Sequence, residues 1–201
     1  MTTKPTPGRP RTTSRHEVQR VALELFAKRG FEETTLDEIA AGVGVSRRTL
    51  FRYYPSKNDI VWGEFSEHLA GLGELLAAAD PDEPLMEVLR RAVVAFNDYG
   101  DEELPVLRNR MNLITSVPAL QGHSMLRYRD WCDVVAEFVA RRLGCKVDDH
   151  LPQVIANAAL GTAMATYRHW ITHPRVNLLS EMDDAFRLLA AGFDERQLRA
   201  R

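Results

Sequence analysis

The segment from Thr35 to Lys57 limits the possible folds of this chain more than any other stretch, because it predicts two short helices separated by a tight turn. Thr35 and Glu38 are spaced as a capping box, in which two side chains satisfy free backbone amides at a helix start. Gly42 and Gly44 follow, and glycine readily adopts the positive φ angles that a sharp turn between helices requires. A first helix that ends in a glycine turn is therefore expected here.

A second helix is predicted directly after this turn. Ser46 is a favourable N-cap, and Pro55 ends the helix. Leu50 and Tyr54 are four residues apart, so both face the core. Two helices joined in this way, over about residues 37–56, form a helix-turn-helix, the arrangement that places a recognition helix in the major groove of DNA. The side chains left to point outward are Arg47, Arg48, Thr49, Arg52 and Tyr53.

A preceding helix is predicted from apolar residues at positions i, i+3, i+4, i+7 and i+8, and it stops at Gly30. Three helices of this kind form a small compact module. The apolar stripe consists of Val18, Val21, Ala22, Leu25 and Phe26.

Over about residues 14–60 the chain closely resembles the amino-terminal domain of TetR-family transcriptional regulators. The resemblance implies an all-helical homodimer of about nine helices per chain. It also implies a three-helix DNA-binding domain and a larger carboxyl-terminal domain for ligand binding and dimerisation, in which a small molecule usually triggers release of the operator. The resemblance rests on residues 21–40 and on Val45, Ser46, Thr49, Leu50, Tyr53, Tyr54 and Lys57.

The distribution of charge agrees with two domains. Residues 1–57 carry eleven Lys and Arg against six Asp and Glu, whereas the rest of the chain carries fifteen against twenty-two. A basic amino-terminal segment followed by an acidic remainder is typical of a phosphate-binding domain joined to a regulatory domain. We therefore predict a disordered basic arm over 1–13, a DNA-binding domain over 14–74 and a ligand-binding and dimerisation domain over 75–201. The arm is either a minor-groove contact or a solubilising tail.

The resemblance also implies which residues lie on or near the DNA. We predict that Arg48 and Arg52 read bases, since a guanidinium can bond a guanine edge twice, and that the polar neighbours bond phosphates. Arg48 stands where the family often has a small residue and Phe51 where Tyr is common, so a different operator sequence is expected. The alternative for these arginines is a solvated helix face. The full predicted set is Thr35, Arg47, Arg48, Thr49, Phe51, Arg52, Tyr53 and Lys57.

Beyond Lys57 the pattern predicts helices throughout, with neither alternating strand patterns nor internal repeats. One long helix over residues 56–79 is expected to link the two domains. The later helices are predicted over residues 84–99, 104–116, 119–143, 148–172 and 180–191.

Large apolar residues in the second domain are expected to form its core, and the family resemblance places an effector cavity among the same helices. Arginines lie alongside them, either in surface ion pairs with acids such as Asp130 and Asp133 or at the basic mouth of that cavity. The predicted ligand-binding residues are Phe96, Arg108, Met111, Ile114, Arg127, Trp131, Phe138, Arg168 and Trp170.

A second resemblance covers this domain. Residues 111–114, 118–120, 127–131 and 136–142 are similar to TetR regulators with an acyl-CoA-like ligand domain, and most similar to the regulators found with mycofactocin biosynthesis genes in actinobacteria. The implied effector is a long-chain acyl-CoA, with its chain in an apolar tunnel and its phosphates near arginines that the sequence does not single out. No cofactor is predicted.

Small residues along the long helix near the carboxyl terminus predict a dimer face, although such residues also serve internal packing. A two-fold dimer would place two recognition helices about 34–36 Å apart, so a palindromic operator is expected. The predicted dimer residues are Leu160, Gly161, Met164, Phe186, Leu189 and Phe193.

Other classes of protein are less favoured. His169 and His173 have the spacing of metal ligands, but the glutamate of a zinc-protease motif and a third ligand are missing, so neither a metal site nor an enzyme is predicted. Cys132 and Cys145 are too far apart for a metal clip or a redox pair. No stretch approaches the roughly 20 apolar residues of a membrane span, and the amino terminus lacks a hydrophobic signal region, so a cytoplasmic protein without a membrane partner is expected.

The sequence thus predicts a homodimeric transcriptional repressor that a small-molecule effector releases from double-stranded DNA. Two alternatives stay open: a regulator of an efflux or catabolic operon that responds to another hydrophobic ligand, and a DNA-binding protein without an inducer. Ligand-dependent release of DNA separates them.

Overall fold

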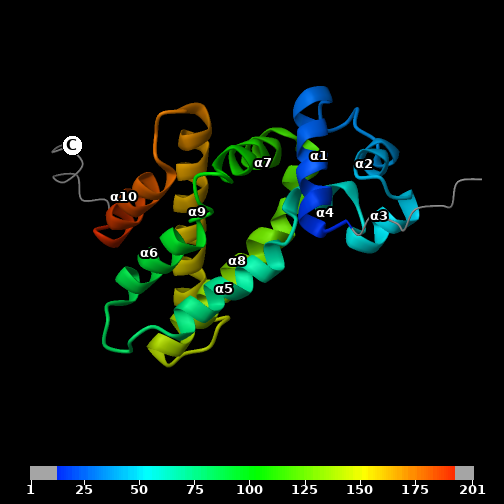
Figure 1. The fold of residues 1–201 in the computed structure, drawn as a ribbon. Helices are drawn as coiled ribbons and strands as arrows, with labels where there is room; N and C mark the ends of the chain where they lie inside the picture. Colours follow the sequence, from blue (N-terminus) through cyan, green and yellow to red (C-terminus); the bar gives the residue numbers. More distant parts are fainter. Residues whose placement is uncertain (1–12, 193–201) are drawn as a thin grey trace, which may run out of the picture. The chain divides into compact units, whose positions relative to one another are not determined.

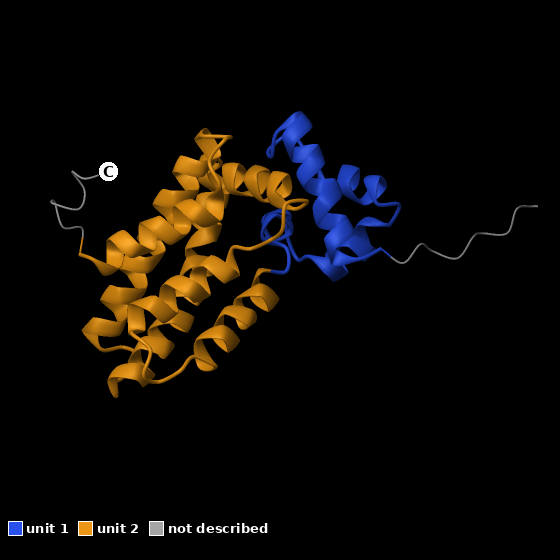
Figure 2. Ribbon diagram, turned by 60° about the vertical axis from the view of Figure 1, so that its left-hand side comes forward, with its two compact units in different colours: residues 1–64 blue, residues 65–201 orange. Residues whose placement is uncertain are grey.

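The chain is helical in the computed structural model, which describes residues 13–192 and has ten α-helices and no strand over that range (Figure 1). It divides into two compact units, the first ending at Glu64 and the second beginning at Phe65 (Figure 2). The predicted domain boundary after residue 74 lies inside a helix of the second unit. The all-helical fold class is confirmed, whereas the predicted basic arm, apart from Thr13, lies outside the described residues.

Unit 1 is a small helical module built around the first helix. Ser14 accepts a hydrogen bond from the Glu17 amide and begins that helix, and Gly30 ends it with φ 91°. The first helix packs on the second and fourth helices, and the second packs on the third. Its core consists mainly of Val18, Ala22, Phe26, Ile39, Leu50 and Ile60. The helices are α1 (Arg15–Arg29), α2 (Leu36–Gly42), α3 (Arg47–Tyr53) and α4 (Lys57–Trp62).

The turn between α2 and α3 is closed by a Schellman motif. Gly44 has φ 71°, and its amide donates to the Ala41 carbonyl at 3.1 Å. The Val45 amide donates to the Ala40 carbonyl at 2.9 Å, which completes the pair of bonds that defines the motif. Gly44 therefore has the predicted role in the turn.

Gly42 has a different role from the one predicted. It is the last residue of α2 rather than a turn residue, and a Cβ built on it would lie 2.8 Å from Cγ1 of Val21. Glycine is needed here because α1 and α2 approach closely, not because the backbone requires a positive φ.

The prediction of one continuous helix over residues 56–79 is wrong. α4 ends at Trp62, and Gly63 has φ 58° and ψ −130°, an angle pair that a helix cannot continue through. The Gln19 side-chain amide donates to the carbonyl of Val61 at 3.1 Å, so α1 binds the last turn of α4 at the point where it stops.

Unit 2 contains the six remaining helices. α8 packs on α9, α9 on α10, and α5 on both α6 and α8. α8 begins with a proline in its first turn and stops at Gly144, which adopts the left-handed conformation. All five later predicted helices are confirmed, with end shifts of a few residues. They follow α5 (Phe65–Ala77) as α6 (Leu85–Phe96), α7 (Leu104–Ser116), α8 (Pro118–Leu143), α9 (His150–Thr172) and α10 (Leu178–Ala190).

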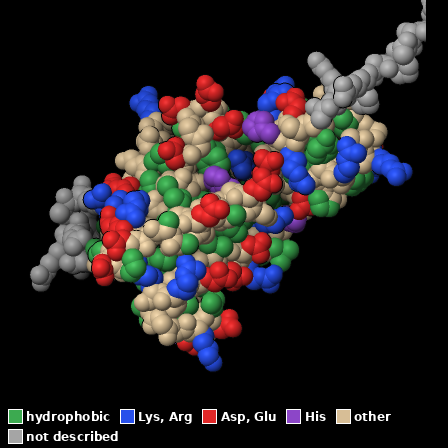
Figure 3. All heavy atoms as spheres, turned by 60° about the horizontal axis from the view of Figure 1, so that its bottom comes forward, with side chains coloured by type: hydrophobic (Ala, Val, Ile, Leu, Met, Phe, Trp, Pro, Cys, Tyr) green, Lys and Arg blue, Asp and Glu red, His purple; other side chains and the backbone are tan. Residues whose placement is uncertain are grey.

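Among residues 13–192, no helix combines the length and apolar character that a membrane crossing needs. On the face drawn in Figure 3, basic and acidic side chains are interspersed with apolar ones rather than gathered into one large patch.

Candidate DNA-binding and effector sites

Two arginines of α3 are available to an external partner. Arg48 and Arg52 are both exposed, and neither has a hydrogen-bond or ion-pair partner within residues 13–192. The Arg52 guanidinium carbon lies 5.6 Å from the centre of the Tyr53 ring, which gives the side chain an aromatic support. Both side chains are therefore free to bond acceptors outside the chain.

The third arginine of α3 is held by its neighbours. Arg47 Nη1 lies 3.1 Å from Oδ2 of Asp37, and its guanidinium carbon lies 5.6 Å from the Phe51 ring centre. Phe51 is itself an exposed large apolar side chain. Arg47 thus links α3 to α2, and Asp37 partly neutralises its charge.

The polar residues predicted to bond phosphates already make bonds within unit 1. The Tyr53 hydroxyl donates to the Thr13 carbonyl at 2.8 Å, and the Thr49 and Ser46 hydroxyls lie 2.9 Å apart. Thr35 and Glu38 form the predicted capping box, and the bond from the Thr35 amide is the main reason that the pKa of Glu38 is lowered. A DNA phosphate oxygen only accepts hydrogen bonds, and a hydroxyl has one O–H donor, so Tyr53 would have to turn its donor away from the Thr13 carbonyl to bond a phosphate. The phosphate contacts of these residues stay predictions.

Lys57 is tied to the loop before α2. Its ammonium donates to the carbonyls of Phe31, Glu32 and Thr34 at 2.7, 3.3 and 3.1 Å, and it lies 4.3 Å from the Phe31 ring centre. An ammonium has three donors, and all three are used. The structure assigns Lys57 a positioning role, and its predicted phosphate contact stays a prediction.

In unit 2, most of the apolar residues predicted to bind a ligand belong to the core. Trp170 is 1% exposed, and four other apolar residues of the predicted ligand-binding set are also buried. Phe96 is also buried, but it lines a surface groove as well. The core members are Met111, Ile114, Trp131, Phe138 and Trp170.

The three arginines predicted to bind a ligand differ in their contacts and exposure. Arg108 donates to the Trp170 and Ile171 carbonyls, and its guanidinium carbon lies 3.8 Å from the Trp170 ring centre. Burial lowers the pKa of Arg108. Arg127 Nη1 lies 3.9 Å from Oδ2 of Asp130, as the ion-pair alternative predicts, and Arg168 is exposed. Arg108 therefore ends α9 by satisfying its last carbonyls.

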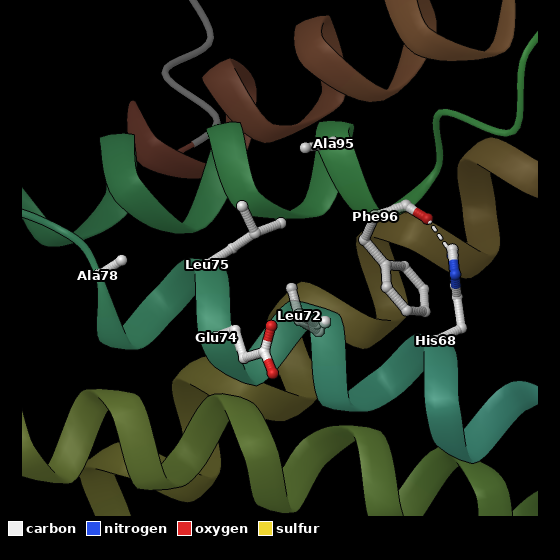
Figure 4. Close-up of a pocket in the computed structure, with 8 residues that line it drawn as sticks. His68, Leu72, Glu74, Leu75, Ala78, Ala95 and Phe96 are labelled. Carbon is white, nitrogen blue, oxygen red and sulfur yellow. Dashed lines mark hydrogen bonds between the residues drawn. The ribbon is translucent and has the colours of Figure 1, made fainter.

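A groove of about 470 Å³ runs between α5 and α6 (Figure 4). Its walls are apolar apart from His68 at one end and Glu74 along the side. His68 Nε2 donates to the Phe96 carbonyl at 2.6 Å, which fixes the imidazole at the end of the groove. The remaining lining residues are Gly71, Leu72, Leu75, Ala78, Ala95 and Phe96.

Beside this groove lies a polar cluster, which we call the inner polar cluster and define as His68, Asn97, Tyr99, Arg110 and Tyr167. Tyr167 donates its hydroxyl to Asn97 Oδ1, and burial raises the pKa of Tyr167. The His68 ring stacks on Tyr99 at 4.8 Å between centres, and the Arg110 guanidinium carbon lies 5.5 Å from the Tyr99 ring centre. The predicted ligand-binding set does not include Arg110, because residues from four separate segments build this cluster and their sequence spacing does not reveal it.

The predicted dimer residues lie on two different sides of α9 and α10. Gly161 and Leu189 line a groove of about 410 Å³, whereas Leu160 and Met164 are half-buried. Phe186 is 0% exposed and packs into the chain's own core, so it is not available to a partner, and Phe193 lies outside the described residues. The other groove residues are Ala158, Thr162, Ala165, Thr166, Ala185 and Leu188.

The two histidines with metal-ligand spacing lie at the surface end of α9. Their ring centres are 4.1 Å apart, and His169 Nδ1 lies 3.3 Å from Oε2 of Glu181 on α10. Among residues 13–192, no group of three or more His, Cys, Asp or Glu side chains could hold a metal ion.

A helix-turn-helix with a basic outer face, followed by a larger helical unit, is typical of DNA-binding transcriptional regulators. The comparisons agree: residues 20–61 match the bacterial regulatory proteins of the tetR family, and residues 83–194 match the MftR C-terminal domain. This chain belongs to the TetR family of transcriptional regulators and carries an MftR C-terminal domain. It is therefore a transcription factor rather than an enzyme.

Individual relatives cover most of the chain. It is 46% identical to the mycofactocin biosynthesis transcriptional regulator MftR of Mycobacterium tuberculosis, over 93% of this chain and 94% of that one. It is 24% identical to the transcriptional activator FasR of Mycolicibacterium smegmatis, over 83% and 76%. Among solved structures, the repressor FadR of Thermus thermophilus in complex with lauroyl-CoA has a TM-score of 0.57 and 27% identity, over 88% of this chain and 93% of that one. The predicted family resemblance is confirmed, including the mycofactocin-associated group.

Proposed function

We propose that this protein is a repressor that binds a palindromic operator as a homodimer in the cytoplasm and is released by a long-chain acyl-CoA. Two-fold symmetry of the dimer would match the symmetry of the operator. The effector would act through unit 2 and the operator through unit 1.

The observation that carries the DNA half of this proposal is the outer face of α3. Arg48 and Arg52 are exposed on the recognition helix and have no partner within the described residues, while Arg47 is held by Asp37. A free guanidinium on a helix that enters the major groove can bond two acceptors on a guanine edge. Arg48 and Arg52 are therefore the residues that we propose to read bases.

The effector half is supported by chemistry and by relatives. The α5–α6 groove has the apolar lining that an alkyl chain needs and a polar cluster at one end. The FadR relative is a repressor crystallised with lauroyl-CoA. FasR is named as an activator, so the direction of regulation needs its own test.

The dimer face that we propose is the α9–α10 groove. Ala158, Gly161, Thr162 and Ala165 follow one side of α9 at helical spacing, and their small side chains allow a second helix to come close. Leu188 and Leu189 of α10 border the same groove. This set keeps Gly161 and Leu189 from the sequence prediction and leaves out Phe186.

The first experiment is a fluorescence-anisotropy titration on the DNA just upstream of the protein's own gene, with and without oleoyl-CoA. Tight, salt-dependent binding that oleoyl-CoA reverses is expected, with free oleate and CoA as controls for a detergent effect. Transcription from the same promoter, with and without the protein, distinguishes a repressor from an activator.

Two other outcomes correspond to the alternatives. Release by another hydrophobic compound, but not by oleoyl-CoA, would identify a regulator of an efflux or catabolic operon. Binding that no amphiphile reverses would leave a DNA-binding protein without an inducer.

A further inference from the structure

The three arginines of the predicted ligand-binding set are either bonded within unit 2 or exposed to solvent. Arg108 bonds the last carbonyls of α9, Arg127 pairs with Asp130, and Arg168 is exposed to solvent. Arg110 is different, because its Nε–H is buried and has no hydrogen-bond partner among residues 13–192.

The surroundings of Arg110 contain aromatic rings and no carboxylate partner within the described residues. Its guanidinium lies over the Tyr99 ring, and the groups that it influences electrostatically are the hydroxyls of Tyr99 and Tyr167. Arginine has donors and no acceptor, so its buried N–H can be satisfied only by an oxygen or another lone-pair atom. A buried donor without a partner destabilises a folded protein, which makes such a group a candidate for binding something else.

The neighbouring side chains do not supply that acceptor. Asn97, which is 2% exposed, accepts the Tyr167 hydroxyl with its Oδ1 and donates its Nδ2 to the Val93 carbonyl at 2.7 Å. Both of its polar atoms make bonds within unit 2, and neither bonds Arg110 Nε. The inner polar cluster holds its own members in place and leaves Arg110 as the donor in excess.

The α5–α6 groove ends at this cluster. His68 lines the end of the groove, and its ring centre lies 4.5 Å from that of Phe96 and 4.8 Å from that of Tyr99. The Tyr99 ring therefore lies just behind this end of the groove, and Arg110 lies against the same ring. From His68 to Ala78 the groove follows α5 for about 15 Å at 1.5 Å per residue. Figure 4 shows Leu72, Leu75 and Phe96 between these two ends. An apolar channel that stops beside a spare guanidinium suits a molecule with an aliphatic chain and an oxygen acceptor at its end.

We propose that Arg110 is the effector-reading arginine of unit 2 and binds the carbonyl or carboxylate oxygen that ends the aliphatic chain of the effector. In the complex, the aliphatic chain lies in the α5–α6 groove. In the protein without ligand, the His68–Tyr99 stack lies between the groove and Arg110, and it moves aside when the ligand enters. Acyl thioesters and free fatty acids share this chemistry. The inference rests on the proposed function, because it names the group that reads the same effector.

The test uses the full-length protein and three variants: Arg110→Met, which removes every donor, Arg110→Lys, which keeps the charge, and Arg129→Met, a matched change of an exposed arginine on α8. Each is titrated with oleoyl-CoA, oleate, oleyl alcohol and CoA. Release from the operator is followed by anisotropy, and binding without DNA is followed by the shift of the melting temperature.

For the wild type we expect release by oleoyl-CoA and not by oleyl alcohol, which lacks the carbonyl; release by oleate at low concentration, below its micelle-forming range, would assign the free fatty acid as a second ligand of the same site. Arg110→Met should raise the concentration for half-release at least about tenfold, a loss of about 1.4 kcal/mol. Its operator affinity should stay unchanged, and its melting temperature without ligand should be equal or higher, because the unpaired donor is gone. The half-release concentration of Arg110→Lys should fall between those of the wild type and Arg110→Met, and that of Arg129→Met should match the wild type.

Two results would overturn the assignment: an Arg110→Met protein that responds at the wild-type concentration, or a wild type that oleyl alcohol releases as well as oleoyl-CoA does. Failure of the wild type to respond to either acyl compound would instead remove the acyl effector from the proposed function, and the inference with it. A variant that melts early and loses operator binding would show that Arg110 maintains the fold, which also contradicts the assignment.

Discussion

α3 of unit 1 and α7 of unit 2 each carry arginines that matter to the proposed function, but the two helices place them in opposite surroundings. Arg48 and Arg52 extend from α3 into solvent, whereas Arg108 and Arg110 lie against aromatic rings. An exposed guanidinium is hydrated and costs little to leave unpaired. A buried guanidinium is destabilising unless it finds hydrogen-bond acceptors, so its hydrogen bonds indicate its role. The difference teaches that an exposed arginine on the recognition helix is identified by its lack of partners, while a half-buried one is identified by the bonds that it makes or lacks.

The largest effect should come from removing both free arginines of α3. Arg48→Ala combined with Arg52→Ala should weaken specific operator binding by about 2–6 kcal/mol, because each arginine that reads a base contributes about 1–3 kcal/mol. Stability should hardly change, because both side chains are exposed. Anisotropy titrations on the operator and on a scrambled duplex measure the loss of affinity and of specificity. Arg20→Ala is the control, since Arg20 lies on α1 and pairs with Glu17 and Glu24; equal losses in both proteins would contradict the assignment.

Arg108→Met should reverse this pattern. It leaves the Trp170 and Ile171 carbonyls without their donor and removes the stacking on Trp170, so we expect a loss of about 1–3 kcal/mol in the free energy of unfolding. Urea unfolding followed by tryptophan fluorescence measures it, with Arg129→Met as the exposed control. The folded variant should keep its response to the effector. A stable variant that no longer responds would move Arg108 from the fold to the ligand.

Gly42→Ala tests whether the presentation of α3 depends on the packing beneath it. The added methyl group would meet the stiff β-branched Val21, which costs about 1–3 kcal/mol, and the better helix propensity of alanine returns at most about 1 kcal/mol. We expect a net loss of about 1–2 kcal/mol in thermal unfolding. Gly122→Ala, at a helical glycine with open space around it, should instead be neutral or stabilising. Equal stability of the two variants would show that α1 and α2 separate easily.

The smallest effect concerns the two thiols. Burial raises the pKa of Cys132 to about 11, so it carries almost no thiolate at pH 8, whereas Cys145 is half-buried. Because its folded pKa is above the unfolded one, Cys132 should contribute a small loss of stability as the pH rises from about 9 towards 11. At pH 8, a thiol reagent should label Cys145 quickly and Cys132 only with unfolding, without affecting operator binding. Rapid labelling of Cys132 in the Cys145→Ala variant would show that the α8 core opens.

The sequence predicted the parts of the fold that depend on near neighbours. The caps at Thr35 and Ser46, the turn at Gly44 and the span of α7 follow from residues within one or two helical turns. The stop at Gly63 did not follow, because Gln19 binds α4 from a distant part of the chain.

The candidate effector site was harder to predict for the same reason. Arg108 and Arg110 are two positions apart, and residues two apart on a helix point in roughly opposite directions. The sequence prediction included Arg108 and left out Arg110, but in the structure Arg108 lies against Trp170 and Arg110 lies against Tyr99. Phe186 shows the same limit, since its hydrophobicity is compatible with a dimer face and with the core where it lies.

The bonds of Lys57 also have a mechanical consequence. The Lys57 ammonium, at the first residue of α4, donates hydrogen bonds to three carbonyls of the loop that leads into α2. Gln19 of α1 donates a hydrogen bond to the other end of α4. A force applied to α4 would therefore not stretch a slack connection. It would pull the loop over residues 31–34 and the start of α2 along with it, so α2 would move together with α4.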